Sequence, residues 1–233
     1  MKRLAIDVGG TFVDCLVADE RGELRAFKAP STPPEFALGV LNSLELAARG
    51  YGVSLSEFLG TVEVLIHGST VATNAIATRQ GAPTGMITTK NFRDIYELRR
   101  GIRLGSINDL FVPPYEPLVP RYLRVGVEER TLYTGQVLAS LDEEEVKGAM
   151  EYLVREGVES VAICFLHSYA NPLNERRALE ICSDHYDKIH TVASHEVLPV
   201  WREYERFSTT VLSAYVGPIV QSYLRSLDQR LRD

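Results

Sequence analysis

Cysteine is scarce in this chain, and the few cysteines share no pattern. Among 233 residues only Cys15, Cys164 and Cys182 occur, an odd number without C-x-x-C spacing. This argues against a disulfide framework. Cys15 and Cys164 lie in apolar runs, so we expect buried free thiols and a cytoplasmic location. The histidines also lack metal-ligand spacing, and the sequence predicts no zinc site.

Two further absences limit the class of protein. No apolar run approaches the ~20 residues of a membrane-spanning helix, and the start of the chain does not read as a signal peptide. The net charge is −6. Nucleic acid is therefore not expected as the main partner, because a phosphate-binding surface needs clustered Lys and Arg. We expect neither a membrane nor a nucleic acid as partner.

The chain does contain an alternation of apolar strands and amphipathic helices. Three strand-like runs, 3–8, 12–18 and 23–29, follow one another across short turns, which predicts an antiparallel start. The alternation that follows predicts an α/β fold. Further strands are expected over 62–66, 86–89, 158–166 and 189–193, and helices over about 34–50, 70–77, 92–99, 142–156, 172–185 and 202–231.

A region rich in proline and glycine interrupts this alternation. Between residues 101 and 120 it leaves no room for a long element, and a hairpin is expected over 123–138. The region could be an inserted lobe or a substrate loop. We therefore predict three parts: a subdomain over 1–100, an insertion with a hairpin over 101–140, and an α/β continuation over 141–233.

The last expected helix carries a broad apolar stripe. Gly217-Pro218 should kink or break this helix. The stripe needs a cover, which could be the rest of the domain, a further domain or a partner subunit. A homo-oligomer formed through this helix is one of these alternatives.

The stretch Asp7-Val8-Gly9-Gly10-Thr11 ends the first strand in a glycine turn. Glycines leave room for backbone to approach a bulky anion, and the turn N–H groups, with the Thr11 hydroxyl, can point at phosphate oxygens. A carboxylate in the place of Asp7 can hold a Mg²⁺-bound water beside those phosphates. The turn is neither a Walker loop nor a Rossmann turn, because no Gly-Lys-Ser/Thr and no helix follows. The alternative is a tight hairpin with a solvated acid.

A second polar cluster follows the strand over 62–66. His67 ends this strand beside a helix N-terminus, a place suited to an anion or a polar substrate. Thr70 and Asn74 share a face of the helix, and Thr73 lies between them. His67 could be a general base or a substrate donor. The alternative is a helix cap beside a structural histidine.

Three further charged residues are candidate substrate contacts. Arg93, in "FRD", could bind a carboxylate or phosphate in bidentate fashion. Arg202 and Glu203 lie in "REYER", where helical spacing would align Arg202 with Arg206. For both segments the alternative is a surface ion pair or ion-pair network.

Several motifs together resemble one family. "IDVGGTFVD" is similar to the first phosphate motif of the actin-like ATPase superfamily, and the ordered set resembles the N-terminal part of the hydantoinase A subunit in the hydantoinase/oxoprolinase family. The resemblance runs over essentially the whole chain. Its motifs are "IDVGGTFVDCLV", "HGSTVATNAI", "ITTKNFRDIYELRR", "PLVPR" and "REYERFSTTVLSAYVGP".

The resemblance implies an RNase H-like mixed sheet flanked by helices and an ATP-dependent opening of lactam or imide rings such as 5-oxoproline and hydantoins. It implies that Asp7 is the metal-side carboxylate and that Gly9, Gly10 and Thr11 hold the phosphates of ATP, with Asp14 on the next strand. Asp14 could equally be an ordinary turn or edge-strand acid. Arg202 or Glu203 would face the active cleft. The implied partner is a hydantoinase B-type subunit or domain.

Two alternatives to a cyclic-amide hydrolase stay open. One is a subunit of an acetone- or acetophenone-type carboxylase that uses the same phosphorylating half-site, and the other is a non-catalytic assembly module. Actin-like ATPases hold the nucleotide between two halves, and Gly9-Gly10 is the only Gly-Gly pair here. We therefore expect the second half to be absent from this chain, and ATP and Mg²⁺ to bind weakly to the chain alone.

Overall fold

We describe the protein from a computed structural model. The structure describes residues 1–102, 105–106, 108, 111–112 and 115–232, so the predicted lobe or substrate loop near 101–120 lies partly outside the described residues. The chain forms two compact units: unit 1 comprises Met1–Gln80 with Ile219–Asp233, and unit 2 comprises Gly81–Pro218. The chain passes from one unit to the other after Gln80 and after Pro218, whereas the sequence predicts domain boundaries near residues 100 and 140. The three parts expected from the sequence stay a prediction. Each unit is described by itself.

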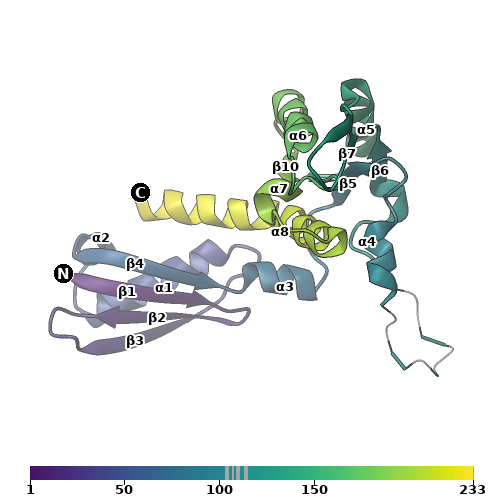
Figure 1. Cartoon of the computed structure of the whole chain (residues 1–233). Coiled ribbons are helices and arrows are strands. Elements are labelled where there is room, and N and C mark those ends of the chain that lie inside the picture. The colour runs from purple at the N-terminus through teal and green to yellow at the C-terminus, as the bar shows by residue number, and fades with distance from the viewer. Residues whose placement is uncertain (103–104, 107, 109–110, 113–114, 233) are drawn as a thin grey trace. The chain divides into compact units, whose positions relative to one another are not determined.

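Unit 1 is built on a mixed sheet with the strand order β3-β2-β1-β4 (Figure 1). β1, β2 and β3 are antiparallel neighbours, as predicted, and β4 pairs parallel to β1. This is the RNase H-like arrangement expected from the sequence. Because β1 and β4 run in the same direction, their carboxyl ends meet at one edge. The strands are β1 (Lys2–Val8), β2 (Phe12–Ala18), β3 (Leu24–Pro30) and β4 (Val62–Ser69).

The two faces of this sheet differ. Leu4, Ile6 and Val8 of β1 are buried in a core with α1 (Phe36–Gly50) and α2 (Leu55–Leu59), and the core also includes Tyr223 and Leu227 of α8 (Glu203–Arg232). Side chains alternate across a strand, so Asp7 lies on the opposite face, where it is exposed.

Helix α2 was not predicted. Ser54 caps it by accepting a hydrogen bond from the Glu57 N–H, and the Glu57 carboxylate accepts one from the Ser54 N–H. This capping box is a local signal that the sequence carries, in the letters S-L-S-E. The next helix, α3 (Val71–Ala77), follows β4 as expected.

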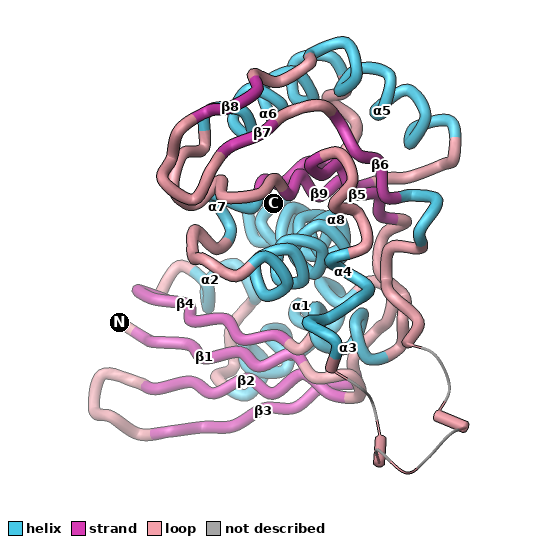
Figure 2. Tube along the Cα trace, turned by 45° about the vertical axis from the view of Figure 1, so that its right-hand side comes forward, coloured by secondary structure: helices cyan, strands magenta, loops and turns pink. Residues whose placement is uncertain are grey.

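Unit 2 contains a fully parallel sheet with the order β10-β9-β5-β6, of which Figure 2 labels β9, β5 and β6. Helices α5 (Glu143–Arg155) and α6 (Leu173–His185) pack against it and against each other. Phe207, Val211 and Ala214 of α8 belong to the same core. The strands are β5 (Thr84–Thr89), β6 (Arg124–Val127), β9 (Ser160–Cys164) and β10 (His190–Ala193).

Two local predictions in unit 2 are wrong in extent. The hairpin expected over 123–138 is limited to β7 (Arg130–Thr131) and β8 (Val137–Ala139), because β6 instead pairs with β5. The helix expected over 92–99 is reduced to α4 (Ile95–Leu98) and a 3-10 turn, η1 (Arg99–Gly101). The left-handed backbone of Arg99 and Arg100 ends that helix. Two short elements were not predicted, η2 (Arg121–Leu123) and α7 (Ser194–Val197). The parallel pairing of β6 with β5 was not predicted either.

Helix α8 runs through Gly217 and Pro218. Of the two alternatives, a kink or a break, the break is therefore wrong and the kink stays a prediction, since the loss of one backbone donor at a proline does not end a helix that is packed on both sides of it. Cys15, Cys164 and Cys182 are free and buried, as predicted. Among the described residues, no helix combines the length and the apolar character required to cross a bilayer.

Leu153 tests the unit 2 core, because it is fully buried while its neighbour Val154 is exposed. Leu153→Ala should lower the free energy of unfolding by about 2–5 kcal/mol, since it removes buried methyl groups and leaves a cavity. Val154→Ala is the matched control and should change this free energy by no more than about 0.5 kcal/mol. Urea unfolding followed by circular dichroism measures both. Equal losses in the two variants would contradict the packing described.

Candidate functional site

The glycine turn between β1 and β2 is closed by a hydrogen bond from the Gly9 N–H to the Phe12 carbonyl, 2.9 Å. A Cβ at Gly9 would lie 3.1 Å from that carbonyl, and a Cβ at Gly10 would lie 3.3 Å from Asn74 Nδ2. Neither glycine has a positive φ. Close approach, not a left-handed backbone, is therefore what favours glycine at both positions.

The N–H groups of the turn are available as donors. Among the described residues, the N–H groups of Gly10 and Thr11 have no hydrogen-bond partner. Two of the turn carbonyls, in contrast, accept hydrogen bonds: Ser31 Oγ donates to Gly9 O at 2.7 Å, and the Ser31 N–H donates to Thr11 O at 2.9 Å. Ser31 thus fixes the turn while two adjacent N–H groups stay free, which suits an anion.

Two carboxylates face each other beside this turn. Asp7 and Asp14 are cross-strand partners on the exposed face of the sheet. Asp14 forms an ion pair with Lys28 at 2.9 Å, whereas Asp7 has no ion-pair partner within the described ranges. Gly68 lies next to Asp7 on β4 and leaves its carboxylate uncovered. Asp7 is therefore the carboxylate that fits a Mg²⁺ ion or its bound water.

Parallel pairing of β1 and β4 brings the second polar cluster to this turn. The Thr70 N–H donates to Val8 O at 3.0 Å, and Thr70 Oγ1 donates to the same carbonyl at 3.2 Å. Asn74 Nδ2 donates to Thr70 Oγ1 at 3.2 Å, which places its amide beside Gly10. Thr73 is exposed on α3. Asp7, Gly10, Thr70 and Asn74 therefore gather at one edge of the sheet.

His67 points away from this edge. In the parallel pairing of β1 and β4, His67 lies opposite Ile6, so both side chains point to the same face of the sheet. Asp7, the next residue of β1, points to the other face. Its Nε2 forms a hydrogen bond with the hydroxyl of Tyr223. Burial lowers the pKa of His67, with a smaller opposing effect of Asp7, and burial raises the pKa of Tyr223 to about 12. His67 is thus a hydrogen-bonded histidine that packs beside Tyr223, and its proposed catalytic role stays a prediction.

The remaining predicted contacts lie in unit 2, in two separate pockets. Arg93 lines a polar pocket of about 380 Å³. In this pocket Arg121 is held by a bidentate contact with Asp94, 2.9 Å at each nitrogen, and Lys90 is paired with Glu145. Arg93 has no ion-pair partner among the residues that the structure describes. It is the cation of this pocket that stays open to an anion.

Arg202 and Glu203 line the second pocket, of about 410 Å³. Arg202 precedes α8 with a left-handed φ of 80°, and its guanidinium lies 4.7 Å from the ring centre of Trp201. Glu203 Oε1 lies 3.9 Å from His167 Nδ1. Because Arg202 is not helical, it does not align with Arg206, and a shared surface network of the two arginines is wrong.

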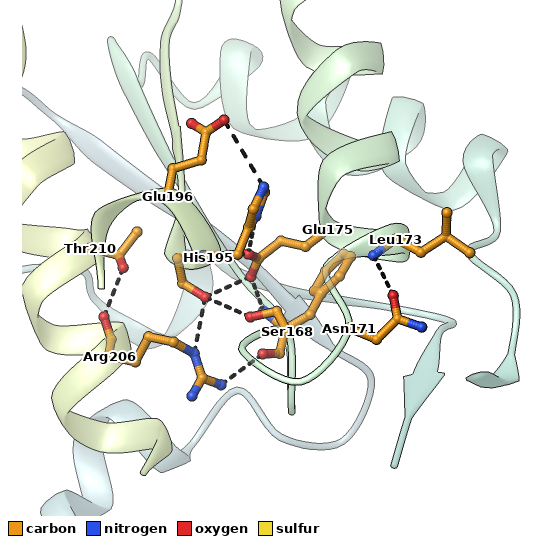
Figure 3. Close-up of polar contacts among 10 residues, drawn as sticks. Ser168, Asn171, Leu173, Glu175, His195, Glu196, Arg206 and Thr210 are labelled. Carbon is orange, nitrogen blue, oxygen red and sulfur yellow. Dashed lines mark hydrogen bonds and ion pairs between the residues drawn. The ribbon is translucent and has the colours of Figure 1, made fainter. Parts of the chain in front are cut away.

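Arg206 is instead fully buried in a network with Glu175 (Figure 3). Arg206 donates to Ser194 Oγ at 3.1 Å and to the carbonyls of Val200 and Phe165 at 2.9 Å. Glu175 accepts hydrogen bonds from the Phe165 N–H and Ser194 Oγ, and from two nitrogens of His195, the backbone N and Nδ1, each at 2.7 Å. His195 thus has a structural place in this network. The network joins the end of β9, α6, α7 and the start of α8.

Sequence reasoning missed three residues of these sites. Tyr223 and Ser31 contact the site only through the tertiary fold, and no local signal indicates them. Trp201 is different, because it is the single tryptophan of the chain and is 64% exposed. A lone exposed tryptophan beside two candidate charged residues is a signal that could have found the pocket.

The strand order of unit 1, with a glycine turn and an acid at its parallel edge, defines an RNase H-like α/β protein. Comparison with known sequences identifies the family within this class. The family model described as "Hydantoinase/oxoprolinase N-terminal region" matches residues 3–186. The chain belongs to the hydantoinase/oxoprolinase family.

Individual relatives agree with this assignment. The alpha subunit of caprolactamase from Pseudomonas jessenii is 37% identical over 97% of this chain and 33% of its own length. The crystal structure of the ATP-dependent caprolactamase from the same organism matches with a TM-score of 0.90 at 36% identity, over 99% of this chain and 33% of that one. A nucleotide-free acetone carboxylase, from a study of ATP-dependent acetone carboxylation, also matches with a TM-score of 0.90, at 32% identity over 99% of this chain and 34% of that one. The chain spans about a third of the length of these relatives.

Glu175 tests the buried network. Glu175→Gln should lower the free energy of unfolding by about 3–5 kcal/mol, because an amide cannot accept all the hydrogen bonds that reach the buried carboxylate. Glu196→Gln is the matched control, since the Glu196 side chain is exposed near His195. The control should stay within about 0.5 kcal/mol of the unchanged protein in the same thermal unfolding measurement. A loss in Glu196→Gln as large as that in Glu175→Gln would show that the network is not the source of the stability.

Proposed function

We propose that this chain is the N-terminal part of an ATP-dependent ring-opening amidohydrolase of the hydantoinase or 5-oxoprolinase type, which phosphorylates a lactam or imide carbonyl oxygen. The observation that carries the proposal is the glycine turn with two free N–H groups beside Asp7, at an edge shared with Thr70 and Asn74. The ATP-dependent relatives support the nucleotide.

Each residue of this edge has a part in the proposed site. The N–H groups of Gly10 and Thr11 donate to phosphate oxygens, and Asp7 holds the metal side. Thr70 and Asn74 add hydroxyl and amide groups at the same edge. Bound ATP supplies the phosphoryl group, which turns a poorly electrophilic amide carbon into one that water can attack. The protein then acts mainly by positioning and by neutralising charge.

A carboxylase subunit is the second candidate, and the acetone carboxylase structure favours it. Phosphorylation of an enolate oxygen would use the same turn, so unit 1 does not discriminate between the two reactions. A hydantoinase B-type partner and a cytoplasmic location are parts of the proposal, and the three free thiols support a reducing compartment. A homo-oligomer through α8 stays a prediction.

Nucleotide binding to the turn can be measured by two-dimensional ¹H–¹⁵N NMR. On addition of ADP and Mg²⁺ at millimolar concentration, the Gly10 and Thr11 amide signals should shift more than other signals of unit 1, because their N–H groups gain phosphate acceptors.

Asp7→Asn should remove the Mg²⁺ dependence of these shifts, and Asp228→Asn, on exposed α8 surface, should keep it. Shifts that are confined to residues away from the turn would contradict the site itself.

The reaction class can be tested by reconstitution with a hydantoinase B-type subunit. Release of phosphate from ATP should depend on a lactam, hydantoin or 5-oxoproline, because the proposed acceptor is an amide oxygen. Dependence on bicarbonate plus a ketone would instead show a carboxylase. No turnover with either substrate set, in an assembly with a complete nucleotide site, would favour a non-catalytic module.

A further inference from the structure

A pocket in unit 2 combines an apolar wall with a free donor and a free acceptor. It has a volume of about 410 Å³ and lies between α4 and the segment that leads into α8. Ile95, Leu98 and Trp201 form its apolar wall, and Arg202 and Glu203 provide its polar groups. This volume lies within the range of small-molecule sites.

The charges around the pocket cancel. Arg100 forms an ion pair with Glu205, which leaves Arg202 and Glu203 as one cation and one anion. An anionic ligand would gain from Arg202 but would be repelled by Glu203. The pocket is therefore suited to an uncharged ligand.

Both polar groups are free to contact a ligand. Arg202 has neither a hydrogen bond nor an ion pair through its side chain within the part of the chain that the structure describes, and its guanidinium lies over Trp201. The distance of 3.9 Å between Glu203 Oε1 and His167 Nδ1 is too long for a hydrogen bond. His167 Nδ1 is itself buried without a hydrogen-bond partner. The pocket thus offers guanidinium donors and a carboxylate acceptor next to each other in sequence.

The buried network holds this wall in place. Arg206 donates to the carbonyl of Val200, the residue before Trp201, and to the carbonyl of Phe165, two residues before His167. Because the Arg206 side chain is fully buried, both segments are anchored to the interior of unit 2. Because these segments are already ordered, less conformational entropy is lost when a ligand binds.

We propose that this pocket binds the substrate as an uncharged cyclic amide: the ring packs on Trp201, Ile95 and Leu98, the amide N–H donates to Glu203, and the amide oxygen accepts from Arg202. The proposal rests on the proposed function and narrows its substrate class. A ketone has no N–H and would leave the Glu203 carboxylate without a partner. 5-Oxoproline carries a carboxylate that Glu203 would repel.

Trp201 allows a direct test, because it is the single tryptophan and gives one indole N–H signal in a ¹H–¹⁵N NMR spectrum of the whole chain. The probes are δ-valerolactam, N-methyl-δ-valerolactam, cyclohexanone and 5-oxoproline. The first three have rings of the same size and differ in the N–H. δ-Valerolactam should shift the indole signal in a saturable way and bind about tenfold or more tightly than the other three probes.

Two variants distinguish a direct contact of Glu203 with the lactam N–H from a structural role of Glu203. Glu203→Leu should weaken binding of δ-valerolactam toward that of the N-methyl compound and leave binding of cyclohexanone unchanged, because only the N–H contact is lost. Glu196→Leu, outside the pocket lining, should leave all affinities unchanged. An equal loss for lactam and ketone in Glu203→Leu would overturn the proposed contact.

Three results would overturn the substrate class: no saturable shift with δ-valerolactam, equal or tighter binding of cyclohexanone or the N-methyl lactam, or tighter binding of 5-oxoproline. The experiment needs neither ATP nor a partner subunit. Lactam binding without any lactam-dependent phosphate release would keep the pocket and reject the proposed function. Lactam-dependent phosphate release without a shift of the Trp201 indole signal would support the proposed function and reject the pocket as the lactam site.

Discussion

The parallel pairing of β1 with β4 is the constraint on which the candidate phosphate site depends. In this register Val8 lies opposite Ser69, and the chain leaves both strands at the same edge. The hydrogen bond from the Thr70 N–H to Val8 O, 3.0 Å, then fixes the first turn of α3 against the glycine turn. A shift of the register by one residue would move Asp7 to the opposite face of the sheet.

Unit 2 has buried polar groups that hold together the loops at the ends of its parallel strands. Its sheet is parallel, so the ends of β9 and β10 also meet at one edge, and Glu175 and Arg206 fill that edge with hydrogen bonds (Figure 3). Buried charges are costly unless they are fully hydrogen-bonded. Here they hold Phe165 and Val200, and so the segments that carry His167 and Trp201. The pocket is thus supported by the interior of unit 2.

The sequence predicted the elements with strong local signals. The alternation in β1, β2 and β3 and the helical spacing in α1 and α5 are set by neighbouring residues, and the strands and helices were found within a few residues. β6 was misplaced because its pairing with β5 involves residues about 40 positions apart. A strand as short as β6, with four residues, carries no sequence pattern that identifies the strand it pairs with.

The candidate site was predictable in part for the same reason. Asp7, Gly9, Gly10 and Thr11 form a local motif, and Thr70 with Asn74 form another, so residue types and spacing indicated both. The contact of His67 with Tyr223 and the burial of Arg206 depend on packing of α8. A charged residue such as Arg206, among several other charged residues of a helix, is expected at the surface. Only the fold shows that it is buried and bonded to the carbonyls of Val200 and Phe165.

The most direct test of the account is a crystal structure of this chain with ADP and Mg²⁺. We expect phosphate oxygens within hydrogen-bond distance of the Gly10 and Thr11 N–H groups, with the metal ion or one of its waters on the Asp7 carboxylate. Nucleotide bound at another place, with the N–H groups of the turn facing solvent, would contradict it.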